Sequence, residues 1–130
     1  MKHFFYSFLF LLSFSLMTGC SKSSSSTNST GNSPYAGTWR GIWNQVATQS
    51  SPAYSGTWDA TINGNGSISG QDNLGYLISG SVNSNGVWNA TGGTDAGDIF
   101  TGNITGNQVT GTWTNPPPQN WHGSFSGSKQ

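Results

Sequence analysis

The sequence predicts an all-β domain: a single eight-stranded antiparallel up-and-down meander that closes into a small barrel. Three observations favour this fold class. After residue 34, bulky apolar residues recur at every second position, which is the periodicity of strands. Gly- and Asn-rich clusters separate these segments at regular intervals. Most segments also carry a glycine or alanine between two large residues. A two-sheet β-sandwich is the alternative, because eight short strands with regular turns also suit it.

The predicted strands are, in order, 37–44, 55–63, 66–71, 75–83, 86–92, 98–105, 107–114 and 120–128. Read at alternate residues, their inner faces are Trp39-Gly41-Trp43, Trp58-Ala60-Ile62, Ile68-Gly70, Ile78-Gly80-Val82, Trp88-Ala90-Gly92, Phe100-Gly102-Ile104, Val109-Gly111-Trp113 and Trp121-Gly123-Phe125. Glycine inside a strand lowers stability unless it permits sharp coiling or a close approach. In a small closed sheet it permits both, and closure removes the two open edges. The barrel is therefore favoured over the sandwich.

The turns give this barrel a polarity. Tight hairpins are predicted at three turns, Asn63-Gly64-Asn65-Gly66, Asn83-Ser84-Asn85-Gly86 and Thr105-Gly106-Asn107. These turns join strands two to three, four to five and six to seven, so they share one end with both termini of the meander. We call this end the base. The other connections are mostly longer and gather at the opposite end, which we call the mouth.

One pair of charged residues predicts the register of the first hairpin. If Arg40 and Asp59 face each other on the outer surface, the numbers of paired residues sum to 99. Trp58 then lies opposite Gly41, and Trp39 lies opposite Ala60. Each indole ring would cover a small neighbour.

Alternation and polarity together predict a candidate ligand site at the mouth. The inward residues nearest the mouth are aromatic, namely Trp43, Trp58, Tyr76, Phe100, Trp113 and Trp121. Asn44 and Asn120 are polar candidates at the rim. Aromatic walls with a few polar groups suit a small apolar ligand, a sugar stacked on Trp, or a protein partner. The alternative is a structural surface protein in which these rings fill the barrel and no ligand binds.

Composition argues against several other functions. The chain has only four Lys and Arg residues and four acidic residues, so it lacks the basic patch of a nucleic-acid-binding protein. His122 is predicted on the outer face without an acid or nucleophile partner, so we expect no enzyme and no cofactor. Asp95 and Asp98 flank a Gly-containing loop, where Asp usually caps its own backbone. No metal site is predicted.

The first nineteen residues resemble an export signal. Lys2 and His3 precede an apolar run over 4–17, which is shorter than the roughly 20 residues of a spanning helix. Met17-Thr18-Gly19-Cys20 resembles the lipobox of bacterial lipoprotein precursors. That resemblance implies cleavage before Cys20 and a lipid on its thiol, which would attach the protein to a membrane. Cys20 is the only cysteine in the chain, so it forms no internal disulfide.

Residues 20–34 are nearly all Ser, Thr, Asn and Gly, which predicts a flexible tether between the lipid and a β-barrel domain over 35–130. In lipoproteins of this kind, Asp after the cysteine tends to retain the protein at the inner membrane. Here the residue is Ser21. The resemblance therefore implies a lipid-anchored protein of the bacterial cell envelope, at the outer membrane.

Gly37-Thr38-Trp39 resembles the Gly-x-Trp motif at the start of the first strand of the calycins, the lipocalins and avidins. In lipocalins this Trp packs at the closed base under an Arg or Lys from the last strand. Trp39 has that position, and Lys129 continues the inward alternation of the last strand. The later strands do not match the avidin biotin site, so the resemblance does not imply biotin.

Overall fold

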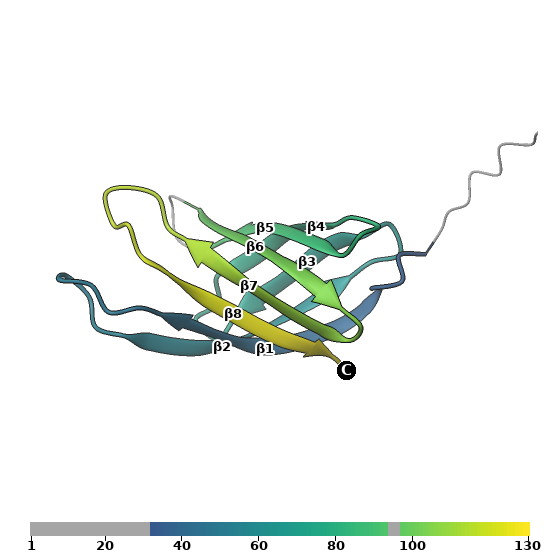
Figure 1. Cartoon of the computed structure of the whole chain (residues 1–130), viewed down its shortest axis with the longest axis horizontal. Coiled ribbons are helices and arrows are strands. Elements are labelled where there is room, and N and C mark those ends of the chain that lie inside the picture. Colours follow the sequence, from purple (N-terminus) through teal and green to yellow (C-terminus); the bar gives the residue numbers. More distant parts are fainter. Residues whose placement is uncertain (1–31, 94–96) are drawn as a thin grey trace, which may run out of the picture.

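The computed structural model describes residues 32–93 and 97–130, and these residues form eight antiparallel strands (Figure 1). The strands are β1 (Gly37–Gln45), β2 (Tyr54–Ile62), β3 (Ser67–Asp72), β4 (Leu77–Val82), β5 (Val87–Gly92), β6 (Asp98–Thr105), β7 (Gln108–Thr114) and β8 (His122–Lys129). Each strand pairs with its neighbours in sequence, and β8 pairs with β1 to close the barrel. The predicted all-β barrel is confirmed, and the sandwich alternative is wrong.

The predicted signal segment, Cys20 and Asp95 lie outside the described residues. Within the ranges that the structure describes, no helix is long and apolar enough to cross a membrane.

The strand alternation is as predicted, and the predicted register of the first hairpin is confirmed. Arg40 pairs with Asp59, and Gly41 pairs with Trp58. Trp39 pairs with Ala60 on one side and with Lys129 on the other. The predicted strand bounds agree with the observed ones to within two residues. Period-two patterning therefore determined which residues face the interior.

The base half of the barrel is filled with side chains. The largest fully buried side chains are Trp39, Trp88, Ile62 and Val109. The indole Nε1 of Trp39 donates a hydrogen bond to the carbonyl oxygen of Tyr35, 2.9 Å away, and Tyr35 packs against the same core. This end therefore has a compact aromatic and aliphatic core, which anchors the start of β1.

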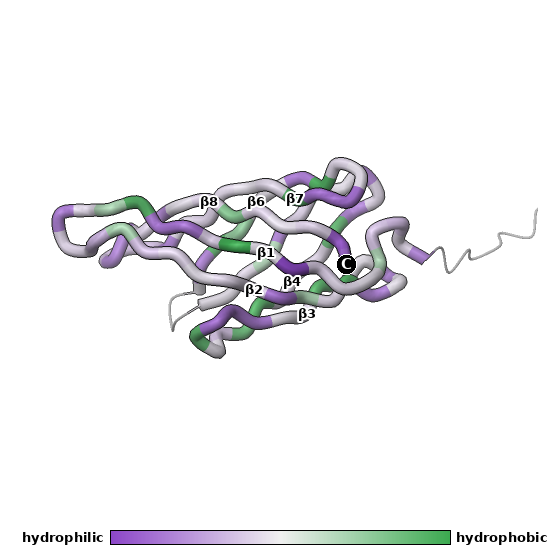
Figure 2. The backbone as a smooth tube through the Cα atoms, turned by 90° about the horizontal axis from the view of Figure 1, so that it is seen from below, coloured by the Kyte–Doolittle hydropathy of each residue, from purple (hydrophilic) through white to green (hydrophobic). Residues whose placement is uncertain are grey.

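Both ends of the described chain lie at the base, and the long loops extend from the opposite end (Figure 2). Ser33 and Pro34, assigned to the tether from the sequence, contact the base. The amide of Ser33 donates to the Gly64 carbonyl at 2.6 Å, and Lys129 Nζ donates to the Pro34 carbonyl at 3.5 Å. The folded unit therefore begins before Tyr35, because the turn after β2 offers a backbone acceptor.

Candidate ligand-binding cavity

The mouth half of the barrel is hollow. A cavity of about 370 Å³ opens between the long loops. Six of the residues that line it are the aromatic residues predicted from the sequence: Trp43, Trp58, Tyr76, Phe100, Trp113 and Trp121. The interior is therefore filled at the base and has an open cavity at the mouth.

The aromatic walls are held in place by backbone acceptors on β1. Trp113 Nε1 donates to the Asn44 carbonyl at 3.1 Å, and Trp58 Nε1 donates to the Ile42 carbonyl at 3.2 Å. The ring of Trp113 also packs edge-on against Trp43, with ring centroids 6.0 Å apart, and stacks on Phe100 at 6.2 Å. These contacts fix the ring orientations, so the cavity is preformed.

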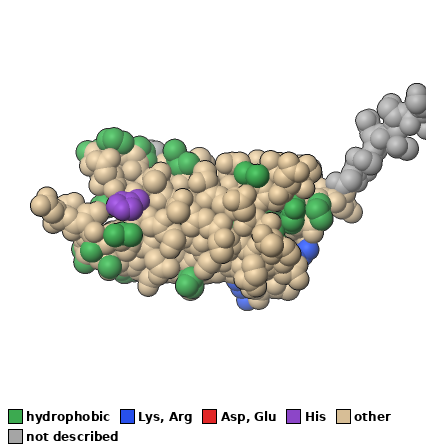
Figure 3. Space-filling view, viewed as in Figure 1, with side chains coloured by type: hydrophobic (Ala, Val, Ile, Leu, Met, Phe, Trp, Pro, Cys, Tyr) green, Lys and Arg blue, Asp and Glu red, His purple; other side chains and the backbone are tan. Residues whose placement is uncertain are grey.

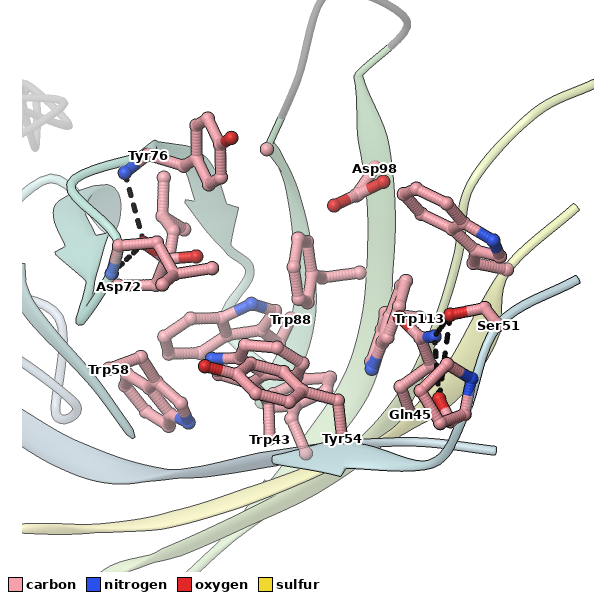
Figure 4. Close-up of a pocket in the computed structure, with 17 residues that line it drawn as sticks. Trp43, Gln45, Ser51, Tyr54, Trp58, Asp72, Tyr76, Trp88, Asp98 and Trp113 are labelled. Carbon is pink, nitrogen blue, oxygen red and sulfur yellow. Dashed lines mark hydrogen bonds between the residues drawn. The ribbon is translucent and has the colours of Figure 1, made fainter. Parts of the chain in front are cut away.

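The floor of the cavity consists of the buried rings of Trp58, Trp88 and Phe125. Figure 4 labels the first two of them. Trp58 lies 5.6 Å from Trp88 and 6.2 Å from Phe125, measured between ring centroids. Trp88 and Phe125 were not predicted to line the cavity, and they belong both to the buried core and to the cavity lining. Phe125 reaches the cavity because its ring lies over Gly102 and Gly111, where a Cβ would come within 2.9 Å and 2.5 Å of ring carbons.

The loops and strand ends contribute lining residues that the sequence analysis missed. They are Gln45, Ser51, Pro52, Tyr54, Asp72, Leu74, Ile78, Gly93 and Asp98. Gln45 Nε2 donates to Ser51 Oγ at 2.7 Å, which ties the end of β1 to the following loop (Figure 4). Alternation could have identified Gln45 and Tyr54, because they share the inward spacing of Trp43 and Trp58. The loop residues have no periodicity that would reveal them.

Two predicted rim residues do not line the cavity. Asn44 follows the inward Trp43, so its side chain is exposed on the outer face, and only its backbone carbonyl contacts a wall residue. Asn120 is exposed with a left-handed φ of 53°, and its side-chain amide donates to the Pro118 carbonyl at 3.3 Å. The structure therefore brings together the six aromatic candidates and leaves both asparagines outside.

Two carboxylates at the rim are the charged side chains that line the cavity. Asp72 Oδ1 accepts hydrogen bonds from the amides of Leu74 and Tyr76 at 2.8 Å and 2.9 Å. Asp98 Oδ1 accepts a hydrogen bond from the side-chain amide of Asn115. Burial raises the pKa of Asp98 above its usual value; the Asn115 bond opposes this shift, and the negative charge of Asp72 adds to it. The two carboxylates are therefore close enough to interact.

The raised pKa of Asp98 predicts a pH-dependent stability. The folded state favours the protonated carboxyl, so the free energy of unfolding falls as the pH rises from below the unfolded pKa through the folded pKa. Asp98→Asn keeps the acceptor oxygen for Asn115 and removes the charge. We expect the variant to melt at a higher temperature than the parent at pH 7, with most of this difference lost at about pH 3.5.

Thermal melts at both pH values measure this effect. Asp59→Asn, which removes an exposed charge from the outer face, is the matched control and should show no comparable gain. A lower melting temperature for Asp98→Asn at pH 7 would contradict the prediction.

The remaining sites considered from the sequence lie away from the cavity lining. His122 is exposed on β8, and its Nδ1 lies 3.4 Å from the Asn120 carbonyl oxygen. Over residues 32–93 and 97–130, no three His, Cys, Asp or Glu side chains are grouped so that they could hold a metal ion. Neither a family model nor a curated protein matches this sequence.

Proposed function

We propose that this protein is a lipid-anchored binding module of the bacterial cell envelope, and that its barrel takes up a small, largely apolar ligand at the mouth. One observation carries the proposal: the mouth half is an open cavity of about 370 Å³ between aromatic walls that are already held in place. This volume is near the lower end of the ~300–1,000 Å³ typical of small-molecule sites.

The polar groups at the rim favour an apolar ligand over a sugar. Gln45 and Ser51 already bond to protein groups at the rim, and Asp72 and Asp98 each use one carboxylate oxygen in the same way. A sugar would need several partners for its hydroxyl groups, because a polar group that is buried without one costs about 1–3 kcal/mol. An apolar or planar ligand needs few such partners and stacks against Trp43, Phe100 or Trp113.

The proposed anchor would direct the cavity away from the membrane. The folded unit starts at the base, where Ser33 bonds to Gly64, so a tether from Cys20 would leave from that end. Ser21 after the lipidated cysteine supports an outer-membrane location. The calycin resemblance is supported by the pairing of Trp39 with Lys129 across the closing strands.

The anchor can be tested by changing the single cysteine. Cys20→Ser removes the thiol that would carry the lipid, so labelled palmitate should no longer enter the protein and uncut precursor should accumulate. Labelling and gel mobility after expression in a bacterial host measure both effects. Unchanged processing and unchanged labelling would show that the lipobox resemblance is misleading.

The cavity can be tested by filling it. Ile78 lines the cavity, so Ile78→Trp should place a larger ring in the open space and weaken binding of an uncharged apolar dye such as Nile red by at least about tenfold. Leu77→Trp is the matched control, because Leu77 is the preceding residue and is 73% exposed on the outer face.

Both variants should keep a cooperative melt, which shows that they fold. Dye fluorescence titrations measure the affinity. Equal dye affinity for the two variants, or no dye binding by the parent protein, would contradict the proposed function.

A further inference from the structure

The charged side chains of the described residues are divided between the two ends of the barrel. Lys129 is at the base, and Arg40 pairs with Asp59 and Ser128 in the strands towards that end. Figure 3 shows Lys and Arg side chains towards this end, hydrophobic side chains at both ends, and a His beside the mouth loops. The two remaining charges, Asp72 and Asp98, both line the cavity, whose lining includes no Lys, Arg or His among the described residues. Among the described residues, the charge that lines the opening is therefore negative alone.

The two carboxylates come from separate elements and lie on opposite sides of the drawn cavity (Figure 4). Asp72 is the last residue of β3, and Asp98 is the first residue of β6. In this meander both of these strand ends lie at the mouth, so the two side chains reach the same opening. Each is fixed through one oxygen, Asp72 by backbone amides and Asp98 by Asn115. The second oxygen of each accepts no hydrogen bond from the described residues. Each carboxylate is thus oriented and retains capacity for a donor or a cation.

Two like charges beside an apolar cavity are unfavourable unless an opposite charge lies between them. Burial and the charge of Asp72 both raise the pKa of Asp98, which is the direction that such a conflict predicts. Perturbed carboxyl groups in a cleft are typical of functional sites. A positively charged ligand would relieve the repulsion, whereas an anionic ligand would increase it.

The aromatic walls suit the same kind of ligand. Trp43 and Tyr54 pack at a centroid distance of 5.5 Å, and Trp43 and Trp113 pack edge-to-face, so ring faces and edges surround the opening. The face of an aromatic ring attracts an ammonium group, most strongly where water is excluded. A ring-lined cavity below two carboxylates therefore offers apolar contact, cation–π contact and ionic contact to one small molecule.

We propose that the ligand is an amphiphilic cation, a protonated amine or quaternary ammonium on an apolar or aromatic body. The body occupies the cavity above Trp58, Trp88 and Phe125, and the cationic group lies at the rim between Asp72 and Asp98. This inference rests on the proposed function of the cavity and assigns the chemical class of its ligand.

Three probes that share a phenylbutyl body and differ in the charge of the end group test this assignment. They are 4-phenylbutyltrimethylammonium, the uncharged pentylbenzene and the anion 5-phenylpentanoate. Quenching of Trp fluorescence or calorimetry at low ionic strength gives the three affinities. The ammonium probe should bind about tenfold or more tighter than the carboxylate, with the uncharged probe between them. Added salt should reduce this difference, because it screens the rim charges.

Asparagine variants identify the groups responsible. Asp72→Asn retains the acceptor oxygen for Leu74 and Tyr76, and Asp98→Asn retains the one for Asn115. Each should weaken binding of the ammonium probe several-fold and reduce the ratio of the affinity for the ammonium probe to the affinity for pentylbenzene. Asp59→Asn on the outer face is the control and should change neither affinity.

The outcomes separate the two proposals. Equal affinity for the three probes would overturn the cation inference while pentylbenzene binding still supports an apolar site. Tighter binding of the carboxylate would also overturn it. Failure of every probe to bind, in a protein that melts cooperatively, would overturn both the cation inference and the proposed function.

Discussion

Trp39→Ala is expected to destabilise the protein by about 3–5 kcal/mol, which is the cost of truncating a large aromatic residue in a packed core. Trp39 is completely buried at the base. Trp39 pairs with Ala60 on β2 and with Lys129 on β8. Its indole Nε1 donates a hydrogen bond to the carbonyl oxygen of Tyr35. Truncation would leave a void that these neighbours cannot fill and would release the residues before β1.

Such a loss is a large part of the free energy of unfolding of a small domain, which is ~5–15 kcal/mol. Denaturant titration followed by Trp fluorescence and circular dichroism measures it, and the melting temperature should fall by more than about 10 °C. Trp121→Ala is the matched control, because Trp121 is a half-buried residue that faces the open cavity at the mouth. It should cost about 1 kcal/mol or less, since only part of its ring is removed from water.

A comparable loss for the two variants would contradict the division of the barrel into a filled base and an open mouth. Trp39→Phe offers a further comparison, because it removes the Nε1 donor but keeps most of the ring. It should fall between the parent and Trp39→Ala.

Period-two alternation was sufficient to predict most of the fold. In six of the eight strands the inward residues place a small residue between two large ones, and a strongly coiled, closed sheet accommodates that pattern. The pairing of Arg40 with Asp59 then determined the register of β1 and β2, because one pair determines all others in an antiparallel ladder. The six aromatic candidates lie at one cavity for a related reason. Alternation predicts which face of the sheet a residue is on, and turn length predicts which end of the barrel it is near.

Alternation could not give the depth to which a ring extends along the barrel. Trp88 and Phe125 were not predicted at the mouth, yet both reach the cavity floor. The ring of Phe125 does so because Gly102 and Gly111 leave room for it. Nor could it place the loop residues that complete the rim, such as Ser51 and Pro52, since their positions depend on hydrogen bonds such as those that Gln45 donates to Ser51 and to the Pro52 carbonyl. Asn44 was wrongly predicted at the rim because it lies near the mouth. It follows the inward Trp43, so its side chain faces outwards.

The glycines that allow this packing should tolerate no side chain, and Gly41 on the closing strand is the clearest test. Gly41 pairs with Trp58 on β2 and Gly127 on β8. A Cβ at this position would lie 1.9 Å from the carbonyl oxygen of Ser126, 2.7 Å from the Gly127 Cα and 2.7 Å from the Trp58 ring. Two of these three neighbours are backbone, so no change of rotamer relieves the clash.

Gly41→Ala is therefore expected to separate β1 from β8 locally and to cost about 3 kcal/mol or more, at or above the upper end for overpacked cores. Ile42→Val on the same strand is the control: Ile42 is half-exposed on the outer face, and valine adds no atoms, so its cost should be below about 1 kcal/mol. Denaturant titration gives both free energies of unfolding, and hydrogen exchange of the β1 and β8 amides shows where the barrel opens. Near-parental stability of Gly41→Ala would mean that the strands at this closure can move apart without loss. The barrel would then not depend on the close approach of β1 to β8, and the small residues between the inward rings would need another explanation.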